Sequence, residues 1–240
     1  MAGAPSDKAG SLSGQAIVIG ATGGIGGAIA DELESSGQYA AVVRLSRRSA
    51  PPVDLTNEAT IAAAAAFVRE SQAPIRLIVV ASGLLGNDTV SPEKSLRDLD
   101  PTSLAHLFAV NAIGPALIAK HFLPLLPRDG RSVFAALSAR VGSIGDNRLG
   151  GWYGYRASKA ALNQMIHTAA IELARTRPAA ICVVLHPGTV ATPLSAPFAK
   201  NGLGIQSPLG AAQRIIGVMK GLRAEDSGGF FDHEGRPIDW

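Results

Sequence analysis

The sequence has very little on which a disulfide framework, a metal site or a membrane span could be built. Its 240 residues include a single cysteine, Cys182, which excludes an intramolecular disulfide and a cysteine-rich metal site. Because Cys182 lies in the apolar run 179–186, we expect a buried thiol. No run reaches the roughly 20 apolar residues that cross a bilayer, and residues 1–15 lack the apolar segment of a signal peptide. We therefore expect a cytoplasmic protein with no membrane partner.

Aromatic and charged residues are also scarce, at 5% and 17% of the chain, so the core must consist of Ala, Val, Ile and Leu. This composition is typical of parallel strands covered by helices. The net charge is +3, but there is no long Lys/Arg run, which argues against a nucleic-acid partner and favours a basic pocket for a small anion. The five histidines show no metal-ligand spacing, so we expect no metal.

Apolar runs and helical patterns alternate along the chain. The expected strands are 15–20, 39–46, 75–82, 131–138, 179–186 and 228–232, and the expected helices are 26–37, 57–71, 103–126, 155–176 and 208–222. Proline should bend or break the third helix near Gly114-Pro115. The alternation predicts an α/β fold with a doubly wound parallel sheet of about seven strands and helices on both faces. Residues 13–240 would form one domain, with 1–12 a flexible tail and 187–206 a substrate loop.

The turn after the first expected strand reads "GATGGIGG" (20–27). A glycine-rich turn alone is as often just a turn as a nucleotide site. Between a first strand and an amphipathic helix, however, it would present bare backbone N–H groups and the positive end of a helix to a pyrophosphate. Its position therefore favours a dinucleotide.

The end of the second expected strand indicates which dinucleotide is bound. It reads Ser46-Arg47-Arg48, with no acidic residue before Asp54. An acidic residue there would bind a ribose 2′-hydroxyl, whereas guanidinium groups bind a 2′-phosphate. The pair favours NADP(H) over NAD(H), and the alternative is that both arginines belong to a solvated loop.

Tyr155 and Lys159 are four residues apart, so on a helix they lie on one face. A phenol has a pKa near 10, and a neighbouring ammonium can lower it by up to about three units unless burial opposes the shift. The pair would then exchange a proton near neutral pH. On spacing alone, a chance surface pair is the commoner explanation.

Four motifs together carry a family resemblance: "GATGGIG", "VNAIGP", "YRASK" and "HPGTVATPL". In order and spacing, from about residue 13 to the C-terminus, they resemble the short-chain dehydrogenase/reductase family, whose fold is of the Rossmann type. The stretches "SARVGSIGDNRLGGWYGYRASKAALN" and "SGGFFDHEGRPIDW" resemble the branch that contains the C-factor signalling protein and carbonyl reductases.

The resemblance implies an NADP(H)-dependent oxidoreductase that transfers hydride between nicotinamide and a carbonyl or alcohol substrate. Tyr155 would be the acid/base, Lys159 would lower its pKa, and Asn111 would anchor a proton-relay water. The alternative is an NADP(H)-binding signalling or sensor protein with little turnover. The family also implies a homodimer or homotetramer formed through helices 103–126 and 155–176. The cofactor-binding residues would be Gly20, Thr22, Gly24, Ile25, Gly26, Ser46, Arg47, Arg48, Asp54, Leu55, Ala81, Ser82, Gly83, Asn111, Tyr155, Lys159, Pro187, Gly188, Val190 and Thr192.

The chain departs from the family pattern in three places. Ile19 replaces a threonine before the first glycine, and Val80-Ala81-Ser82-Gly83 replaces an N-N-A-G motif. Ala139 occupies the position of the catalytic serine, three residues before Gly142. We expect the neighbouring Ser138 to supply the missing hydroxyl. Ser143, or no hydroxyl at all, are the alternatives.

Overall fold

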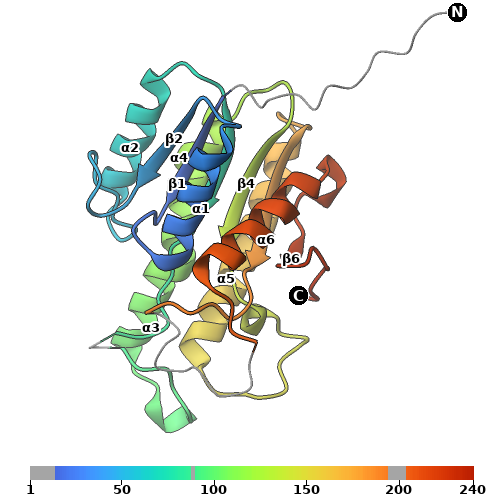
Figure 1. Cartoon of the computed structure of the whole chain (residues 1–240). Helices are drawn as coiled ribbons and strands as arrows, with labels where there is room; N and C mark the ends of the chain where they lie inside the picture. Colours follow the sequence, from blue (N-terminus) through green and yellow to red (C-terminus); the bar gives the residue numbers. More distant parts are fainter. Residues whose placement is uncertain (1–13, 88–89, 194–203) are drawn as a thin grey trace, which may run out of the picture.

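The structure, a computed structural model, describes residues 14–87, 90–193 and 204–240, so the expected tail at 1–12 lies outside it. Within this part of the chain, six parallel strands form one sheet in the order β2-β1-β3-β4-β5-β6 (Figure 1). The strands are β1 (Gln15–Ile19), β2 (Ala41–Leu45), β3 (Ile75–Val80), β4 (Ser132–Leu137), β5 (Ala180–His186) and β6 (Phe230–Asp232). The doubly wound parallel sheet is confirmed, at six strands where about seven were expected.

The order of the strands reverses between β1 and β3, because the chain first adds β2 on one side of β1 and later places β3 on the other. Residues Ile17 and Ile19 pair with Val43 and Leu45 on one neighbour and with Ile78 and Val80 on the other. In parallel sheets, ligands bind beyond the carboxyl ends of the strands at such a reversal. The loops after β1, β2 and β3 are therefore the place to look for a site.

Helices cover both faces of the sheet (Figure 1). Helices α1 (Gly24–Ser36) and α6 (Pro208–Gly221) bury their apolar side chains, among them Ile29 and Ile215, against one face. Helices α2 (Glu58–Glu70), α4 (Gly114–Phe122) and α5 (Tyr153–Ala174) cover the other face. Cys182 is buried in that second core, as expected, and burial raises the pKa of its thiol to about 12.

The expected bend at Gly114-Pro115 takes the form of a wider helical turn rather than a break. Helix α3 (Pro101–Phe108) continues through one π-helical turn, η2 (Ala109–Ile113), into α4 and a final 3-10 turn, η3 (Leu123–Leu125). π-turns of this kind recur at functional sites, and this one contains Asn111. Gly114 is required here, because a Cβ atom would lie 2.6 Å from the Cβ of Leu55.

By length and composition, the stretch Pro101–Leu125 is apolar enough to cross a membrane, so the expectation that no such run exists was wrong. Its apolar character has a structural use. Leu107, Ile118 and Phe122 are fully buried in the protein core. A core helix of this kind passes the same test of length and composition as a membrane span.

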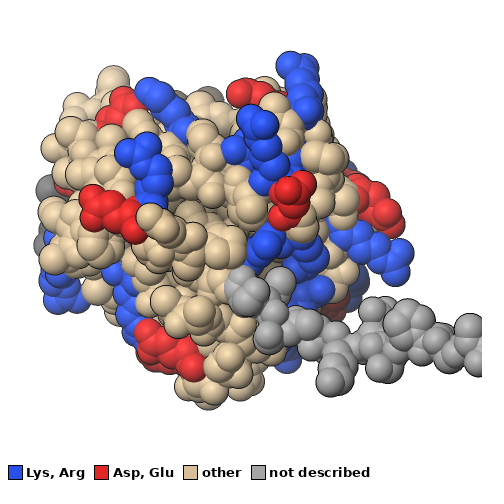
Figure 2. Space-filling view, turned by 90° about the horizontal axis from the view of Figure 1, so that it is seen from above, with Lys and Arg blue, Asp and Glu red and all other residues tan. Residues whose placement is uncertain are grey.

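The surface carries charges of both signs. On the face seen in Figure 2, Lys and Arg side chains alternate with acidic and uncharged ones. One acidic pair on this protein, Asp31 and Glu34 of α1, binds Arg44 of β2 at 2.6 Å and so connects the edge strand to its covering helix.

Candidate active site

A cleft of about 550 Å³ opens at the carboxyl edge of the sheet, where the order of the strands reverses. It is formed by the loops that follow β1, β2 and β3 and by the side of α3 and η2. Of the residues expected to bind the cofactor, nine line it: Gly20, Thr22, Ser46, Arg47, Asp54, Leu55, Ala81, Ser82 and Gly83. The tertiary structure therefore brings these nine residues, which are far apart in the sequence, together in one cleft.

The glycines of the first turn are required by close approach of backbone to backbone. Gly20 has a left-handed φ of 86°, and a Cβ atom there would lie 3.0 Å from the backbone of Ser82. A Cβ on Gly26 would lie 2.3 Å from the carbonyl oxygen of Gly20, which is closer than real contacts allow. Gly24 opens helix α1, where its missing Cβ leaves room for the methyl group of Thr192. Ile25 packs its side chain toward the core beneath α1.

The end of β2 presents the basic pair to the cleft. Ser46 is buried, and its hydroxyl oxygen accepts the N–H of Arg48 at 3.1 Å. Arg47 lines the cleft, whereas Arg48 is exposed and lies outside its lining. In the part of the chain that the structure describes, neither arginine has an acidic partner within salt-bridge distance, so both guanidinium groups are available to an anion. Asp54 accepts two hydrogen bonds from Thr56, and these hold the pKa of its carboxyl below the usual value.

The loop after β3 closes the floor of the cleft. In place of the missing asparagine amides, a backbone bond from Ala81 N–H to the Ile19 carbonyl braces the sheet at 2.8 Å. Ser82 lines the cleft, and its hydroxyl oxygen is buried without a hydrogen-bond partner among the described residues. Buried hydroxyls are nearly always paired, so this unpaired group indicates a ligand. The bare glycine turn, the free guanidinium and the unpaired hydroxyl all fit a phosphorylated dinucleotide.

At the inner end of this loop, Gly83 connects the cleft to the catalytic candidates. A Cβ atom on Gly83 would lie 3.5 Å from the Lys159 ammonium nitrogen and 3.6 Å from the Asn111 Oδ1 atom. Tyr155 and Lys159 are both buried, one turn apart on α5, and Lys159 Nζ lies 6.0 Å from the centre of the Tyr155 ring. Lys159 donates to the Leu137 carbonyl at 2.9 Å.

The pKa of Tyr155 corrects one expectation. Burial raises it to about 12, where we expected Lys159 to lower it. Burial likewise lowers the pKa of Lys159 to about 8, because the site holds its ammonium away from water. Desolvation accounts for both shifts, since both side chains are buried.

Asn111 is fully buried, and its amide makes three hydrogen bonds. Its Oδ1 accepts the N–H of Leu84 at 2.7 Å, and its Nδ2 donates to the Leu84 carbonyl at 2.7 Å and to Ser158 Oγ at 3.1 Å. Ser158 in turn donates to the Tyr155 carbonyl at 2.9 Å. The asparagine therefore joins the π-turn, the loop after β3 and helix α5. The hydrogen bond between Asn111 and Ser158 includes Ser158 in this network.

Ser138, which we expected to supply the hydroxyl missing at Ala139, forms a hydrogen bond within the core instead. Its hydroxyl is buried and donates to Asn163 Oδ1 at 2.6 Å, on the part of α5 one turn beyond Lys159. Ser143 is also buried, and its oxygen accepts the N–H of Asp146 at 3.0 Å. Gly142, between them, packs against Lys159: a Cβ there would lie 2.9 Å from the Lys159 Cβ.

The remaining expected residues follow β5. Pro187 and Gly188 leave the strand in a turn with a positive φ at Gly188, and Val190 forms a parallel bridge with Gln206. Thr192 lies against the start of α1. Half of the expected substrate loop 187–206, residues 194–203, lies outside the described residues.

Comparisons with known proteins agree with this geometry. A family model described as short chain dehydrogenase matches residues 15–202. The C-signal protein of Myxococcus xanthus is 35% identical over 147 residues, covering 61% of this chain and 84% of that protein. The 1-hydroxy-2-glutathionyl-2-methyl-3-butene dehydrogenase of Rhodococcus sp. is 30% identical over 233 residues, covering 93% and 98%. A short-chain dehydrogenase/reductase structure from Burkholderia multivorans with bound NADP has a TM-score of 0.79 and 26% identity, covering 95% and 99%.

Proposed function

Because the chain belongs to the short chain dehydrogenase family, we propose that it is an NADP(H)-dependent oxidoreductase acting on a carbonyl or alcohol substrate. The observation that carries this proposal is the position of Gly83, which lines the cleft and where a Cβ atom would lie 3.5 Å from Lys159 Nζ and 3.6 Å from Asn111 Oδ1. The cleft that fits a nucleotide and the buried acid/base group thus form one continuous site.

The bound nicotinamide would supply or accept the hydride. Tyr155 is the group that moves the proton, since its phenol remains protonated at neutral pH and can donate to the oxygen of a carbonyl as charge develops there. Lys159, whose ammonium lies 6.0 Å from the centre of the Tyr155 ring, stabilises that developing charge. Asn111 holds Leu84 and, through Ser158, the Tyr155 backbone, and so fixes the phenol relative to the cleft.

A hydroxyl that orients the carbonyl must come from another residue than Ala139. We propose Ser143, because the Ser138 hydroxyl already donates to Asn163 whereas Ser143 uses its oxygen only as an acceptor. Replacing Ser143 with Ala should lower kcat with little loss of stability. Replacing Ser138 with Ala should lower stability more than kcat, since it leaves the Asn163 oxygen without its donor. The reverse result would return the role to Ser138.

The preference for NADP(H) follows from charge. Arg47 borders the cleft without an acidic partner among the described residues, and a guanidinium group matches a 2′-phosphate. The Burkholderia multivorans relative, at 26% identity, holds NADP. Both support the phosphorylated cofactor.

The two tyrosines at the start of α5 provide the test. Tyr155 is buried, whereas Tyr153 is 37% exposed and lies two residues away on the same turn. NADPH binding followed by fluorescence should be similar in the wild type, Tyr155→Phe and Tyr153→Phe. NADPH oxidation against a panel of aldehydes, ketones and quinones should be lost only in Tyr155→Phe. Binding without turnover on any member of the panel would contradict the reductase and favour an NADP(H) sensor.

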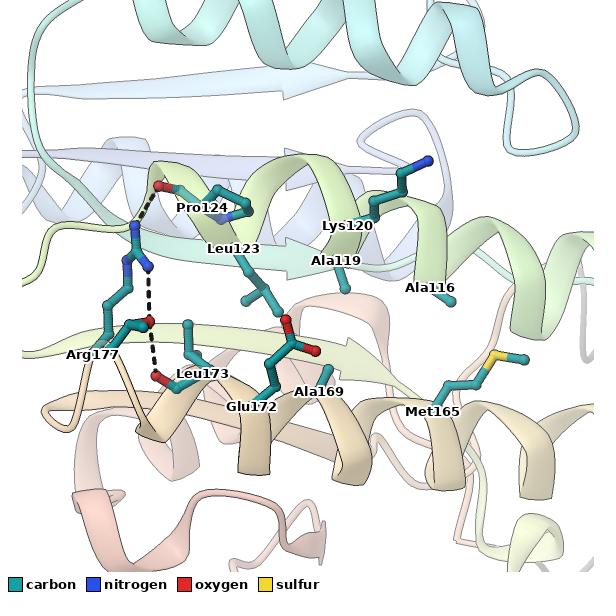
Figure 3. A pocket seen from close by; sticks show the side chains of 11 residues that line it. Ala116, Ala119, Lys120, Leu123, Pro124, Met165, Ala169, Glu172, Leu173 and Arg177 are labelled. Carbon is teal, nitrogen blue, oxygen red and sulfur yellow. Dashed lines mark hydrogen bonds between the residues drawn. The ribbon is translucent and has the colours of Figure 1, made fainter.

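We also propose that the protein forms a homodimer or homotetramer through α4 and α5. A groove runs between these helices, with small and apolar side chains on its floor: Ala116, Ala119, Leu123 and Ala169 (Figure 3). Met165 on its rim is 38% exposed. Sedimentation should give a dimer or tetramer, and Ala169→Glu should give a monomer.

A further inference from the structure

Glu93 is a buried carboxylate that the proposed chemistry does not use. It follows β3 in the loop that leads to α3, and only 3% of it is exposed. A charged side chain almost never lies at this depth without a partner. Within the described ranges 14–87, 90–193 and 204–240, no cation lies within salt-bridge distance of it. Its partner is a helix terminus.

Both carboxylate oxygens of Glu93 accept the N–H of Gly154, at 3.1 and 3.2 Å, and its backbone carbonyl accepts the N–H of Trp152 at 2.6 Å. Gly154 is the second residue of α5, so its N–H is one of the donors that the helix itself leaves unpaired. The residue before the helix, Trp152, forms no side-chain cap. Glu93 therefore acts as the cap of α5 from a loop 61 residues away.

The backbone at this point requires such a restraint. Gly150, Gly151 and Trp152 have successive φ values of 64°, 67° and 53°, all left-handed. For tryptophan this conformation is strained, and strain of this kind persists only where neighbouring contacts enforce it. On the other side, Arg156 donates to the carbonyls of Gly151 at 2.9 Å and Gly150 at 3.2 Å. Glu93 and Arg156 hold the turn between them.

Glycine at position 154 fits this arrangement. A Cβ atom there would lie 2.7 Å from Glu93 Oε1 and 2.7 Å from the Leu107 side chain, so the carboxylate is seated directly on the helix backbone. Tyr155 is the next residue. A shift of the carboxylate would therefore shift the Gly154 backbone that donates to it, and with it the adjacent backbone of Tyr155.

We propose that Glu93 is a positioning residue for Tyr155: by capping α5 it fixes the phenol at the distance and angle that proton transfer requires. This rests on the proposed oxidoreductase function. A displacement of about 1 Å in a catalytic group can cost on the order of 100-fold in rate, although the group itself is intact. Loss of the cap should therefore reduce kcat by about 10- to 100-fold while leaving NADPH affinity within about threefold of the wild type, because Glu93 itself does not line the cleft.

The experiment compares Glu93→Ala, Glu93→Gln and a control that loses a helix cap far from the site. Gln keeps an oxygen acceptor for the Gly154 N–H, so Glu93→Gln should recover most of the kcat that Glu93→Ala loses. The control is Arg131→Ala: Arg131 donates to the Met219 and Leu222 carbonyls at the end of α6, on the amino edge of the sheet. It should lower thermal stability similarly and leave kcat unchanged. If Glu93→Ala does not fold, Glu93→Asp shortens the side chain and tests the same bond.

Hydrogen–deuterium exchange of a peptide covering 150–158 gives a second readout that does not depend on turnover. Exchange should be faster in Glu93→Ala than in the wild type and unchanged in Arg131→Ala. Unchanged exchange in Glu93→Ala would overturn the cap. Faster exchange with an unchanged kcat would overturn the positioning role and leave the oxidoreductase standing. A wild type that oxidises no NADPH would refute the proposed function, and with it the role of Glu93 in positioning, even if the exchange shows the cap to be present.

Discussion

Replacing Lys159 with methionine should make the protein more stable and catalytically inactive. Lys159 is 3% exposed and its ammonium has one protein partner among the described residues, the Leu137 carbonyl. Burial lowers its pKa from 10.5 to about 8. Each pH unit corresponds to about 1.4 kcal/mol, so the charged form costs the folded state about 3 kcal/mol at neutral pH. Methionine has a similar length and no charge to desolvate.

The pH dependence of folding stability shows whether the buried charge of Lys159 is the cause of this gain. Below about pH 8, Lys159 is charged in both the folded and unfolded states, and the full cost of burying the charge is present. Between pH 8 and 10.5 the folded protein has lost this proton and the unfolded chain still holds it, so wild-type stability rises with pH. The methionine variant lacks this rise. Allowing about 1 kcal/mol for the hydrogen bond lost at Leu137, we expect Lys159→Met to be more stable by about 2 kcal/mol near neutral pH, with the advantage gone near pH 10.

The measurement is urea unfolding of both proteins across this pH range. In thermal unfolding, the advantage should correspond to about 4–8 °C for a chain of this size. Lys120→Met is the matched control: its side chain is 61% exposed and paired with Glu58, so it should show neither the gain nor the pH dependence. The reasoning is refuted if Lys159→Met is less stable than the wild type near neutral pH, or if its advantage does not shrink as the pH rises.

Three further outcomes are expected. Arg47→Glu should weaken NADPH binding by at least about tenfold, consistent with loss of a charge-assisted bond worth roughly 1.5–3 kcal/mol, and leave NADH binding unchanged in the same fluorescence titration. Gly26→Ala should abolish dinucleotide binding and lower the thermal midpoint, because its Cβ would lie 2.3 Å from the Gly20 carbonyl oxygen. Gly27→Ala, whose Cβ has a closest contact of 3.3 Å, should keep both the binding and the thermal midpoint of the wild type. Cys182, whose thiol pKa is raised to about 12, should resist alkylation in the native protein and react fully in denaturant.

The sequence was sufficient for the order of elements and for the residues that line the cleft after β1 and β2. Alternating strand and helix patterns are local signals, and a glycine turn after a first strand has few structural uses. Helix α2 begins within one residue of the expected 57, and the side chain of Asn57 caps it by accepting the Ala59 N–H at 3.1 Å. The number of strands and the π-turn were not accessible in this way. The π-turn contains Asn111, which is hydrogen-bonded to Leu84, far away in the sequence. Hydrogen bonds between distant residues produce no periodic pattern in the sequence from which they could be predicted.

For Tyr155 and Lys159, the sequence predicted their position on one helix but not the direction in which burial shifts their pKa values. Spacing places Tyr155 and Lys159 on one face of a helix, but it does not say how deeply that face is buried. Likewise, the adjacency of Ser138 and Ala139 could not show which way either side chain points, and the structure gives the Ser138 hydroxyl to Asn163. Nothing in the sequence indicated the role of Glu93. An acidic residue in a loop is expected to be exposed to solvent unless its tertiary partner is known.

The direction of the Tyr155 shift has a chemical consequence. A phenol whose pKa is about 12 is protonated at neutral pH, which is the form that donates a proton to a developing alkoxide. The opposite reaction, oxidation of an alcohol, requires the phenolate, and burial disfavours that form. Lys159, with a pKa near 8, still carries its charge at neutral pH and loses it just above. In the site as folded, both groups are therefore in the protonation states that carbonyl reduction needs, and alcohol oxidation should require a more alkaline medium or the added positive charge of an oxidised nicotinamide.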